Sequence, residues 1–367
     1  DVTVKYTSGG DQLPTVLSTA LAGGNPPDLA ALAQPGLLAD YAKKGAIKPI
    51  DFAKGDLAQG YSPDWIKLGT VDGKLYGFVF KGANKSTVWF NVKAFSDAGV
   101  QPPKTWDELL QDAQTLKSSG VDPYSIGGAD GWTLTDLFEN IYLRQAGPDK
   151  YDQLAKHAIP WTDPSVKAAF ATMAKIVGDT GDINGGASGA LQTDFPTSVT
   201  NVYSSPPKAA MVFEGDFVAG VITSSTKAKP KTDFDVFDFP AIGSSGPSVV
   251  GGGDTVVMFK DSPAAEALVR YLASPEAASI WAKLGGFSSP NRNVPASDYP
   301  DDITRATATA LANAQTFRFD MSDLQPASFG ATVGQGEFKL FQDFLKSPGN
   351  IDGILTQLEA AAAKAYK

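Results

Sequence analysis

Apolar segments with strand-like spacing and segments with helix-like spacing alternate along the whole chain. Apolar and polar residues alternate over residues 1–6, which predicts a half-buried strand, and residues 15–22 predict a helix that ends before Asn25-Pro26-Pro27. Five more segments rich in β-branched and aromatic residues predict strands: 75–80, 87–91, 209–213, 234–237 and 255–259. This alternation is typical of an α/β fold, in which helices cover the faces of sheets.

Capping residues and glycines mark where helices are expected to begin and where loops are expected. Thr105 and Glu108 have the spacing of a capping box. Three further capping residues each precede a proline that suits the first helical position: Asp163, Ser262 and Ser274. Glycine-rich segments at 178–194 and 244–254 predict loops. The second contains Gly251-Gly252-Gly253 directly before a predicted strand, which gives the backbone freedom to hinge.

Length and composition narrow the class of protein. With 367 residues, of which 43% are apolar, the chain exceeds the size of one hydrophobic core, so we expect two domains. Its 40 acidic and 31 basic residues give a net charge of −9, which disfavours nucleic acid as a partner. The chain has no cysteine, which excludes disulfides and thiolate metal sites.

Few catalytic or metal-binding patterns are present. His157 is the single histidine, and no Gly-x-Ser-x-Gly segment occurs, so neither a serine hydrolase triad nor a histidine metal site is expected. Glu214 and Asp216, in FEGDF, directly follow the strand predicted at 209–213. They are open to three interpretations: a solvated turn, acceptors for the hydroxyls of a sugar, or the two carboxylates of a glycosidase.

A tryptophan stands at the start of the helix predicted in GADGWTLTDLFENIYL. Trp132 and Asp136 lie four residues apart and therefore share one face of that helix. A separate apolar stripe is supplied by other residues of the segment: Leu134, Leu137, Phe138 and Ile141. Trp132 therefore has two interpretations, an aromatic plate for a sugar beside its carboxylate or a buried core residue.

The ordered series of segments resembles the extracellular solute-binding proteins of ABC importers, in particular the carbohydrate-binding group that includes maltodextrin- and α-glucoside-binding proteins. The similar segments begin with GNPPDLAALAQPG and VDGKLYGFVF, continue through STVWFNVKAFSDAGVQPPKTWDELL and GWTLTDLFENIYLRQAG, and end with FRFDMSDLQPASFG. Between them, AAMVFEGDF, GGGDTVVMF and YLASPEAASIWAKLGGFSSPN follow in the order of the family. The GGFSSPN part is most similar to the α-glucoside branch.

The resemblance implies a periplasmic-binding-protein-like α/β fold, with two lobes, a multi-segment hinge and a ligand cleft between the lobes. The first lobe would consist of residues 1–92 and 254–311, and the second of residues 93–253 and 312–367. Residues 1–6 match the second strand of the family, so its first strand and helix are expected to be missing from the first lobe. The glycines at 251–253 would lie in a hinge strand.

The resemblance also implies which residues contact the ligand. Trp132 would face the sugar, and Asp136 would accept hydrogen bonds from its hydroxyls. Arg318 would orient the acids, touch the ligand or form a structural salt bridge, and Trp65 is either a second aromatic plate or a core residue. The remaining implied contacts are Gln34, Glu214, Asp216, Gly253, Asp254, Asp320 and Asp323.

The implied function is the capture of a sugar by lobe closure and its delivery to the membrane permease of an ABC importer. We expect a di- or oligosaccharide, with an α-glucoside favoured, and a monomer that uses no cofactor or metal and is not an enzyme. The protein would work in the periplasm or outside the cell, with a lipid anchor as one arrangement. Two alternatives stay open: a glycoside hydrolase that uses paired carboxylates, and a binding protein for a cationic solute such as a polyamine.

Overall fold

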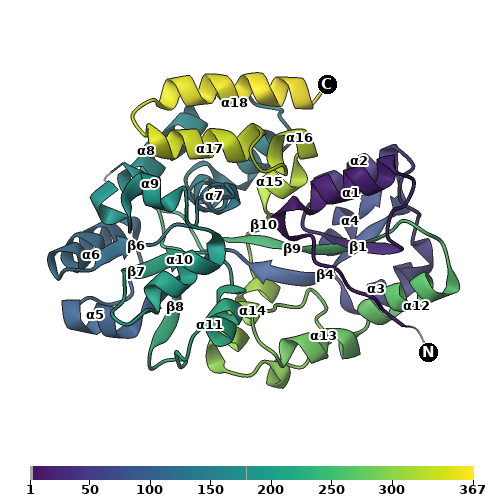
Figure 1. Cartoon of the computed structure of the whole chain (residues 1–367), viewed down its shortest axis with the longest axis horizontal. Coiled ribbons are helices and arrows are strands. Elements are labelled where there is room, and N and C mark those ends of the chain that lie inside the picture. Colours follow the sequence, from purple (N-terminus) through teal and green to yellow (C-terminus); the bar gives the residue numbers. More distant parts are fainter. Residues whose placement is uncertain (1–2, 179) are drawn as a thin grey trace.

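Two four-stranded sheets organise the computed structural model, which describes residues 3–178 and 180–367 (Figure 1). We call the sheets, with the helices that cover them, the first and the second lobe. The first sheet contains β1 (Leu29–Leu32), β4 (Gly77–Asn84), β9 (Val249–Met258) and β10 (Phe317–Phe319). The second has the order β6 (Asp122–Tyr124), β7 (Ala209–Phe213), β5 (Thr87–Asn91) and β8 (Phe234–Asp238).

Strand β9 runs through the middle of the molecule, between the two groups of helices in Figure 1. Its first residues pair in parallel with β10, and its last residues pair antiparallel with β1. The neighbouring strand β4 pairs antiparallel with β9 along both parts. After β4 the chain passes directly to β5, which pairs antiparallel with β7 and β8 in the second sheet. The connection at Lys85 and Ser86 therefore joins the two sheets.

Helices cover both sheets, and the cores lie between helices and strands. The first lobe carries α1 (Leu13–Ala22), α2 (Pro35–Lys43), α3 (Lys54–Gly60), α4 (Pro63–Leu68), a short hairpin of β2 (Thr70–Val71) and β3 (Lys74–Leu75), α12 (Pro263–Leu272) and α13 (Pro275–Ala282). Helix α14 (Asp302–Ala312) packs against β4 and β9. None of the helices within the described part of the chain is long and apolar enough to cross a membrane.

The second lobe is the more helical one, and the C-terminal helices cover its upper face in Figure 1. Its helices are α5 (Val92–Ala98), α6 (Trp106–Ser118), α7 (Trp132–Ala155), α8 (Pro164–Val177), α9 (Gly186–Ala190), α10 (Phe195–Val202), α11 (Val218–Ser225), α15 (Met321–Leu324), α16 (Ala327–Gly330), α17 (Gly336–Lys346) and α18 (Ile351–Ala365). Helix α7 is central because its apolar stripe is buried in the main core: Leu134, Leu137, Phe138 and Ile141.

The predicted capping residues have the expected contacts. Thr105 and Glu108 form a reciprocal capping box at the start of α6. The side chains of Asp163, Ser262 and Ser274 accept hydrogen bonds from the first turns of α8, α12 and α13, each of which begins with proline. Local sequence therefore sets these helix starts, because each side chain satisfies a backbone N–H group that has no partner within its helix.

Three predictions of local structure were wrong, and one of them is the loop predicted at 178–194, which contains the short helix α9. Residues 3–6 form no strand, and Val4 and Tyr6 are exposed, because no neighbouring strand among the described residues supplies hydrogen bonds to them. The loop predicted at 244–254 ends early, since β9 already begins at Val249 and contains all three glycines.

Close packing explains the glycines in β9. A Cβ atom on Gly251 would lie 2.3 Å from the Phe317 ring, and one on Gly253 would lie 2.2 Å from the Lys81 carbonyl oxygen. These contacts are too short for any side chain, so the glycines let neighbouring segments approach the strand closely.

Candidate functional site

The first turn of α7 presents an aromatic ring next to charged groups. Gly131 precedes it with a φ of 93° and lies so close to Phe338 that a Cβ atom there would clash, so only glycine fits this turn. Trp132, the first residue of the helix, packs against the rings of Phe195 and Phe217, with centroids 5.2 and 6.1 Å away. Its indole Nε1 is buried and has no hydrogen-bond partner within the described residues.

A buried lysine lies against this turn. Lys85 Nζ lies 3.1 Å from Asp136 Oδ1 and 2.5 Å from Asp320 Oδ2. The same ammonium group is 5.5 Å from the centroid of the Trp132 ring, which is a cation–π distance. Lys85 therefore brings Asp320, which was predicted separately, together with Trp132 and Asp136, which were predicted to share one helix face.

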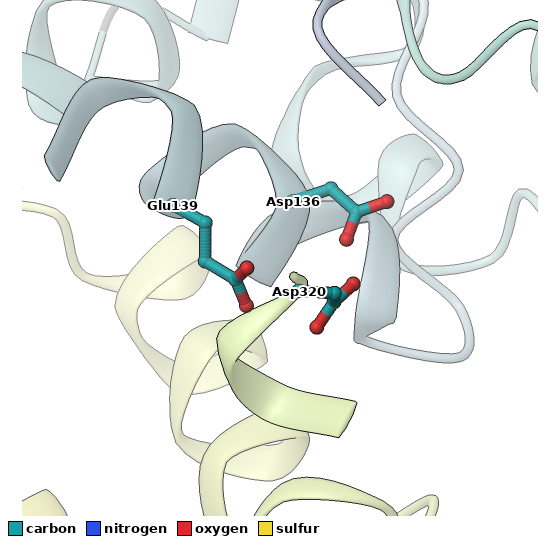
Figure 2. Close-up of side chains that lie close together, drawn as sticks. All are labelled: Asp136, Glu139 and Asp320. Carbon is teal, nitrogen blue, oxygen red and sulfur yellow. The ribbon is translucent and has the colours of Figure 1, made fainter. Parts of the chain in front are cut away.

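Three carboxylates from α7 and the start of α15 gather beside this lysine. Figure 2 shows Asp136 and Glu139 of α7 next to Asp320, and one oxygen atom of each lies within 4.8 Å of the others. Asp320 caps α15, because its Oδ1 accepts hydrogen bonds from Asp323 N and Ser322 Oγ. Glu139 accepts hydrogen bonds from the backbone N–H groups of Met321 and Ser322 and from the Tyr151 hydroxyl.

The hydrogen-bond and ion-pair partners of the three carboxylates determine whether they can bind a metal ion. Three acids at this spacing resemble the ligands of a hard metal ion. However, the ammonium group of Lys85 already contacts both Asp136 and Asp320, and Glu139 accepts hydrogen bonds from the N-terminus of α15. The geometry therefore fits an internal cation better than a metal ion.

Burial and the lysine set the proton affinities of the cluster. Burial raises the pKa of Asp136 to about 8, although Lys85 opposes this shift. Burial also acts to raise the pKa of Asp320, but Lys85 outweighs it and lowers that pKa to about 2. Asp323 is buried as well, and burial together with the charge of Asp320 raises its pKa. Asp320 is therefore the ionised partner of Lys85 at neutral pH.

The FEGDF segment places two more acids at the end of β7. Both carboxylate oxygens of Glu214 are buried, and in the described part of the chain the carboxyl group of Asp136 is the one group that shares a hydrogen bond with them. Burial and the nearby charge of Asp136 raise the pKa of Glu214. Asp216 Oδ2 accepts hydrogen bonds from Asn84 N and Ser288 Oγ, so this acid connects the end of β7 to the first lobe. Glu214 thus lies beside the Lys85 cluster, whereas Asp216 bridges two segments of the protein.

Other predicted contacts lie outside the Lys85 cluster. Arg318 donates a hydrogen bond from Nε to Asp152 Oδ1 at 2.6 Å, so it forms a salt bridge, which was one of the three roles expected for it. Trp65 is half-buried, with its ring 5.1 Å from that of Phe317. Gln34 is half-buried and precedes α2, which packs against α15.

Gly253 and Asp254 belong to β9, where Asp254 pairs with Lys81 at 2.9 Å. The charge of Asp254 also acts on Asp323, which places this pair at the margin of the cluster.

Lys85 was missed by the sequence analysis. It stands between the strands predicted at 75–80 and 87–91, but its acid partners are 51 and 235 residues away in the chain. No local spacing relates such positions, so the one available signal was the large number of acids predicted for the site, which need a cation wherever they are buried.

Comparisons with known proteins show the family of the chain. Residues 1–279 match the family described as bacterial extracellular solute-binding protein. The chain is 35% identical over 337 residues to the osmoprotective compounds-binding protein GgtB of Synechocystis sp.. The aligned region covers 90% of this chain and 78% of the relative. It is 34% identical over 345 residues to the alpha-glucosides-binding periplasmic protein AglE of Rhizobium meliloti, covering 90% of this chain and 75% of that protein.

A solved structure supports the fold. The bacterial solute receptor AcbH, whose structure is described as showing a preference for β-D-galactopyranose, superimposes with a TM-score of 0.86 at 23% identity and covers 100% of this chain and 91% of its own. The predicted periplasmic-binding-protein-like architecture is thereby confirmed, while the residue boundaries predicted for the lobes stay a prediction. The chain belongs to the family of bacterial extracellular solute-binding proteins.

Proposed function

We propose that this protein is the sugar receptor of an ABC importer and that it binds a neutral α-glucoside at the first turn of α7. The observation that carries this proposal is the group formed by Trp132, Asp136 and Glu214. Trp132 Nε1 is a buried donor without an acceptor in the described structure, and Asp136 Oδ2 and both Glu214 oxygens are buried atoms whose hydrogen-bonding neighbours there are other carboxyl groups alone. Buried polar atoms usually have hydrogen-bond partners, and the hydroxyls of a ligand would supply them here.

The chemistry of a sugar suits this group. A pyranose ring has apolar faces of C–H groups and a rim of hydroxyls, so an aromatic ring covers a face while carboxyl groups bind the rim. The partly buried Trp132 ring offers such a surface. An ionised carboxylate accepts hydrogen bonds from hydroxyls, and a protonated one also donates. The raised pKa values of Asp136 and Glu214 therefore allow both kinds of contact.

The relatives and the local charge favour an uncharged glucoside. Two relatives at 34% and 35% identity are named for alpha-glucosides and for osmoprotective compounds. Lys85 lies 3.1 Å from Asp136 and would repel the ammonium groups of a polyamine. A cationic ligand would also compete with Lys85 for the same carboxylates.

Transport would follow from the difference between open and closed lobes. A sugar that touches both lobes stabilises the closed arrangement, which the permease would then recognise. The receptor would act as a monomer in the periplasm or at the cell surface, and a lipid anchor is one way to hold it there. Binding needs no covalent step, so we propose no enzymatic activity.

Several other ligand contacts are proposed only because the sequence resembles carbohydrate-binding proteins. Asp320 and Asp323 lie in the Lys85 cluster, and Asp254 lies at its margin. The remaining candidates are Gln34, Trp65, Asp216, Gly253 and Arg318. Of these, Arg318 is the least suited to contact a ligand, because its guanidinium group is already bound to Asp152.

The test is isothermal titration calorimetry of the wild-type protein with sucrose, trehalose, maltose, maltotriose and spermidine, followed by analysis of the recovered ligand. We expect one-to-one binding of at least one of these sugars, which is recovered intact. Cleavage of the sugar would contradict the receptor function and would make Glu214 and Asp216 the catalytic candidates. Binding of spermidine alone would exclude the carbohydrate assignment.

A further inference from the structure

Glu214 follows β7 directly and lies beside the Lys85 cluster. Its N–H group donates a hydrogen bond to the carbonyl oxygen of Thr87 in β5 at 3.3 Å, and its own carbonyl oxygen accepts one from Thr87 Oγ1 at 2.5 Å. The residue is only 2% exposed. The backbone of Glu214 is therefore fixed by the second sheet, and its carboxyl group has to find its partners inside the protein.

The side chain of Glu214 has one hydrogen-bonding neighbour within the described residues, and this neighbour is another acid. Its carboxyl group shares a hydrogen bond with that of Asp136. Two ionised carboxylates cannot form such a bond, because each of them only accepts hydrogen bonds. One proton between the two groups makes the bond possible, as in other pairs of buried carboxyl groups. The contact between Glu214 and Asp136 therefore contains a proton.

The donors around the cluster indicate which acid carries this proton. Asp320 contacts Lys85 and accepts two further hydrogen bonds at the start of α15, so it is ionised. Asp136 has Lys85 Nζ at 3.1 Å from its Oδ1. Glu214 has no comparable donor in the described structure, so ionising it would leave a buried charge without stabilising hydrogen bonds. The proton therefore belongs to Glu214.

The charged groups around Glu214 favour the same assignment. Helix α10, which packs on β7, and helix α11, which follows the FEGDF segment, contain no charged residue. One ammonium group, that of Lys85, faces a larger number of acids from α7, α15, β9 and the segment before α15: Asp136, Glu139, Asp254, Asp320 and Asp323. One cation cannot compensate so many buried negative charges, so some of these acids stay protonated. Burial and the charge of Asp136 raise the pKa of Glu214 accordingly.

We propose that Glu214 is the proton-bearing hydrogen-bond donor of the sugar site, so that the protein binds its neutral sugar only while this carboxyl group is protonated. This inference rests on the proposed function. Glu214 keeps its proton and donates it in a hydrogen bond to an accepting oxygen of the sugar, while Asp136 accepts a hydrogen bond from a hydroxyl. No covalent bond of the sugar changes. An uncharged Glu214 also offers a polyamine no charge to bind.

The first measurement detects the proton without any ligand. Carbon-13 NMR of protein labelled at the side-chain carboxyl carbon of glutamate distinguishes protonated from ionised groups. The signal that disappears in Glu214→Gln belongs to Glu214. We expect this signal to report a protonated group at about pH 7, above the ordinary pKa of glutamate. The signal of an ionised carboxylate at that pH would overturn the proposal.

The second measurement follows the affinity for the best sugar of the calorimetric panel as the pH rises. Once the carbon-13 signal shows Glu214 ionising, the wild-type affinity should fall by about tenfold per pH unit, because only the protonated form binds. Glu214→Gln cannot ionise and should lose this decrease, whatever its own affinity is. The matched control is Asp97→Asn, which removes the same charge from an exposed acid paired with Lys93 on α5 and should retain the decrease.

A third measurement needs no variant and decides the question if Glu214→Gln fails to fold. Calorimetry of the wild type in two buffers with different ionisation enthalpies reports protons that are taken up on binding. At a pH at which the affinity is falling, we expect the protein to take up a proton with the sugar. Equal binding enthalpies in the two buffers at that pH would overturn the proposal.

The possible failures have different consequences. A protonated Glu214 together with a pH-dependent affinity that Glu214→Gln abolishes supports the donor role. A wild-type affinity that stays constant while Glu214 ionises overturns the donor role but leaves the sugar receptor intact. Failure of the wild type to bind any sugar of the panel overturns the proposed function and the donor role together.

Discussion

Two lysines of the same chain segment illustrate how environment changes an ion pair. Lys81, in β4, pairs with Asp254 on the neighbouring strand β9 at 2.9 Å, and the two side chains are 23% and 29% exposed. Lys85, four residues later, contacts Asp136 and Asp320, and these three side chains are 10%, 4% and 1% exposed. Both lysines face acids, but only Lys85 has lost almost all contact with water.

The two ion pairs therefore differ in how much each contributes to the stability of the fold. Solvent screens the Lys81–Asp254 pair, so this cross-strand contact is worth little on its own. A buried pair is different, because the loss of one partner leaves an uncompensated charge in the interior. The Lys85 cluster is therefore tied to the integrity of the junction between the sheets, whereas the Lys81 pair is dispensable.

The largest expected effect on stability is found by removing the charge of one acid from each ion pair and comparing the two losses. Asp320→Asn retains an oxygen that can cap α15 but leaves Lys85 with a weaker counter-charge. We expect the free energy of unfolding to fall by about 3 to 5 kcal/mol, as for other broken buried pairs. Asp254→Asn should lower it by less than about 1 kcal/mol. Urea unfolding of both variants at pH 7 measures the difference, and equal losses would remove the distinction between the two lysines.

A smaller effect is expected from Asp216, a buried acid that contacts neither lysine. Burial raises its pKa from the ordinary 3.8 to about 6, although hydrogen bonds from Ser288 and Asn84 oppose the shift. The folded protein therefore binds this proton more tightly than the unfolded chain, so the stability that Asp216 contributes is lost as the pH rises from about 4 to about 6. The loss is at most about 3 kcal/mol, since one pKa unit corresponds to about 1.4 kcal/mol.

Asp216→Asn isolates this contribution from that of other buried acids. Asp136, Glu214 and Asp323 also have raised pKa values and shift stability in the same direction. Unfolding free energies of wild type and Asp216→Asn, measured between pH 4 and 7, should therefore differ in slope between pH 4 and 6. Parallel curves would show that Asp216 is already ionised at low pH in the folded protein.

The third prediction separates the two candidate aromatic plates. Trp132→Ala should weaken sugar binding by about 10- to 100-fold, because burying the face of one large aromatic ring contributes roughly 1.5–3 kcal/mol. Trp65→Ala is the matched control, since its ring packs beside Phe317 rather than at the Lys85 cluster. We expect a change in affinity of less than about threefold for this variant, measured by calorimetry. A greater loss in Trp65→Ala would place the sugar on the first lobe.

The sequence was most informative where local chemistry decides the structure. The proline-led helices with their caps were predicted at the right residues, because a cap acts within one turn. The strands at 87–91 and 209–213 were also predicted correctly, since both are buried along their whole length. Of the strand predicted at 1–6, residues 1–2 lie outside the described residues. The prediction failed for residues 3–6 because pairing depends on a distant partner, which alternation within six residues does not reveal.

The candidate site was predictable only in part. Trp132 and Asp136 could be placed together because they lie four residues apart on one helix. Asp320 joins them only through the fold, and Lys85 has no local motif at all. Arg318 lies between Phe317 and Phe319 in β10, so its side chain points to the opposite sheet face from its neighbours. That alternation was readable in the sequence but did not identify Asp152 as its partner.

The most direct test of the account is a crystal structure of the protein grown with the sugar that binds best in the calorimetric panel. We predict that one pyranose ring lies against the indole of Trp132, with its hydroxyls within hydrogen-bond distance of Asp136 and Glu214, and that Lys85 keeps its contact with Asp136. A sugar bound elsewhere, with Trp132 and these two carboxyl groups free of ligand contacts, would contradict the central claim.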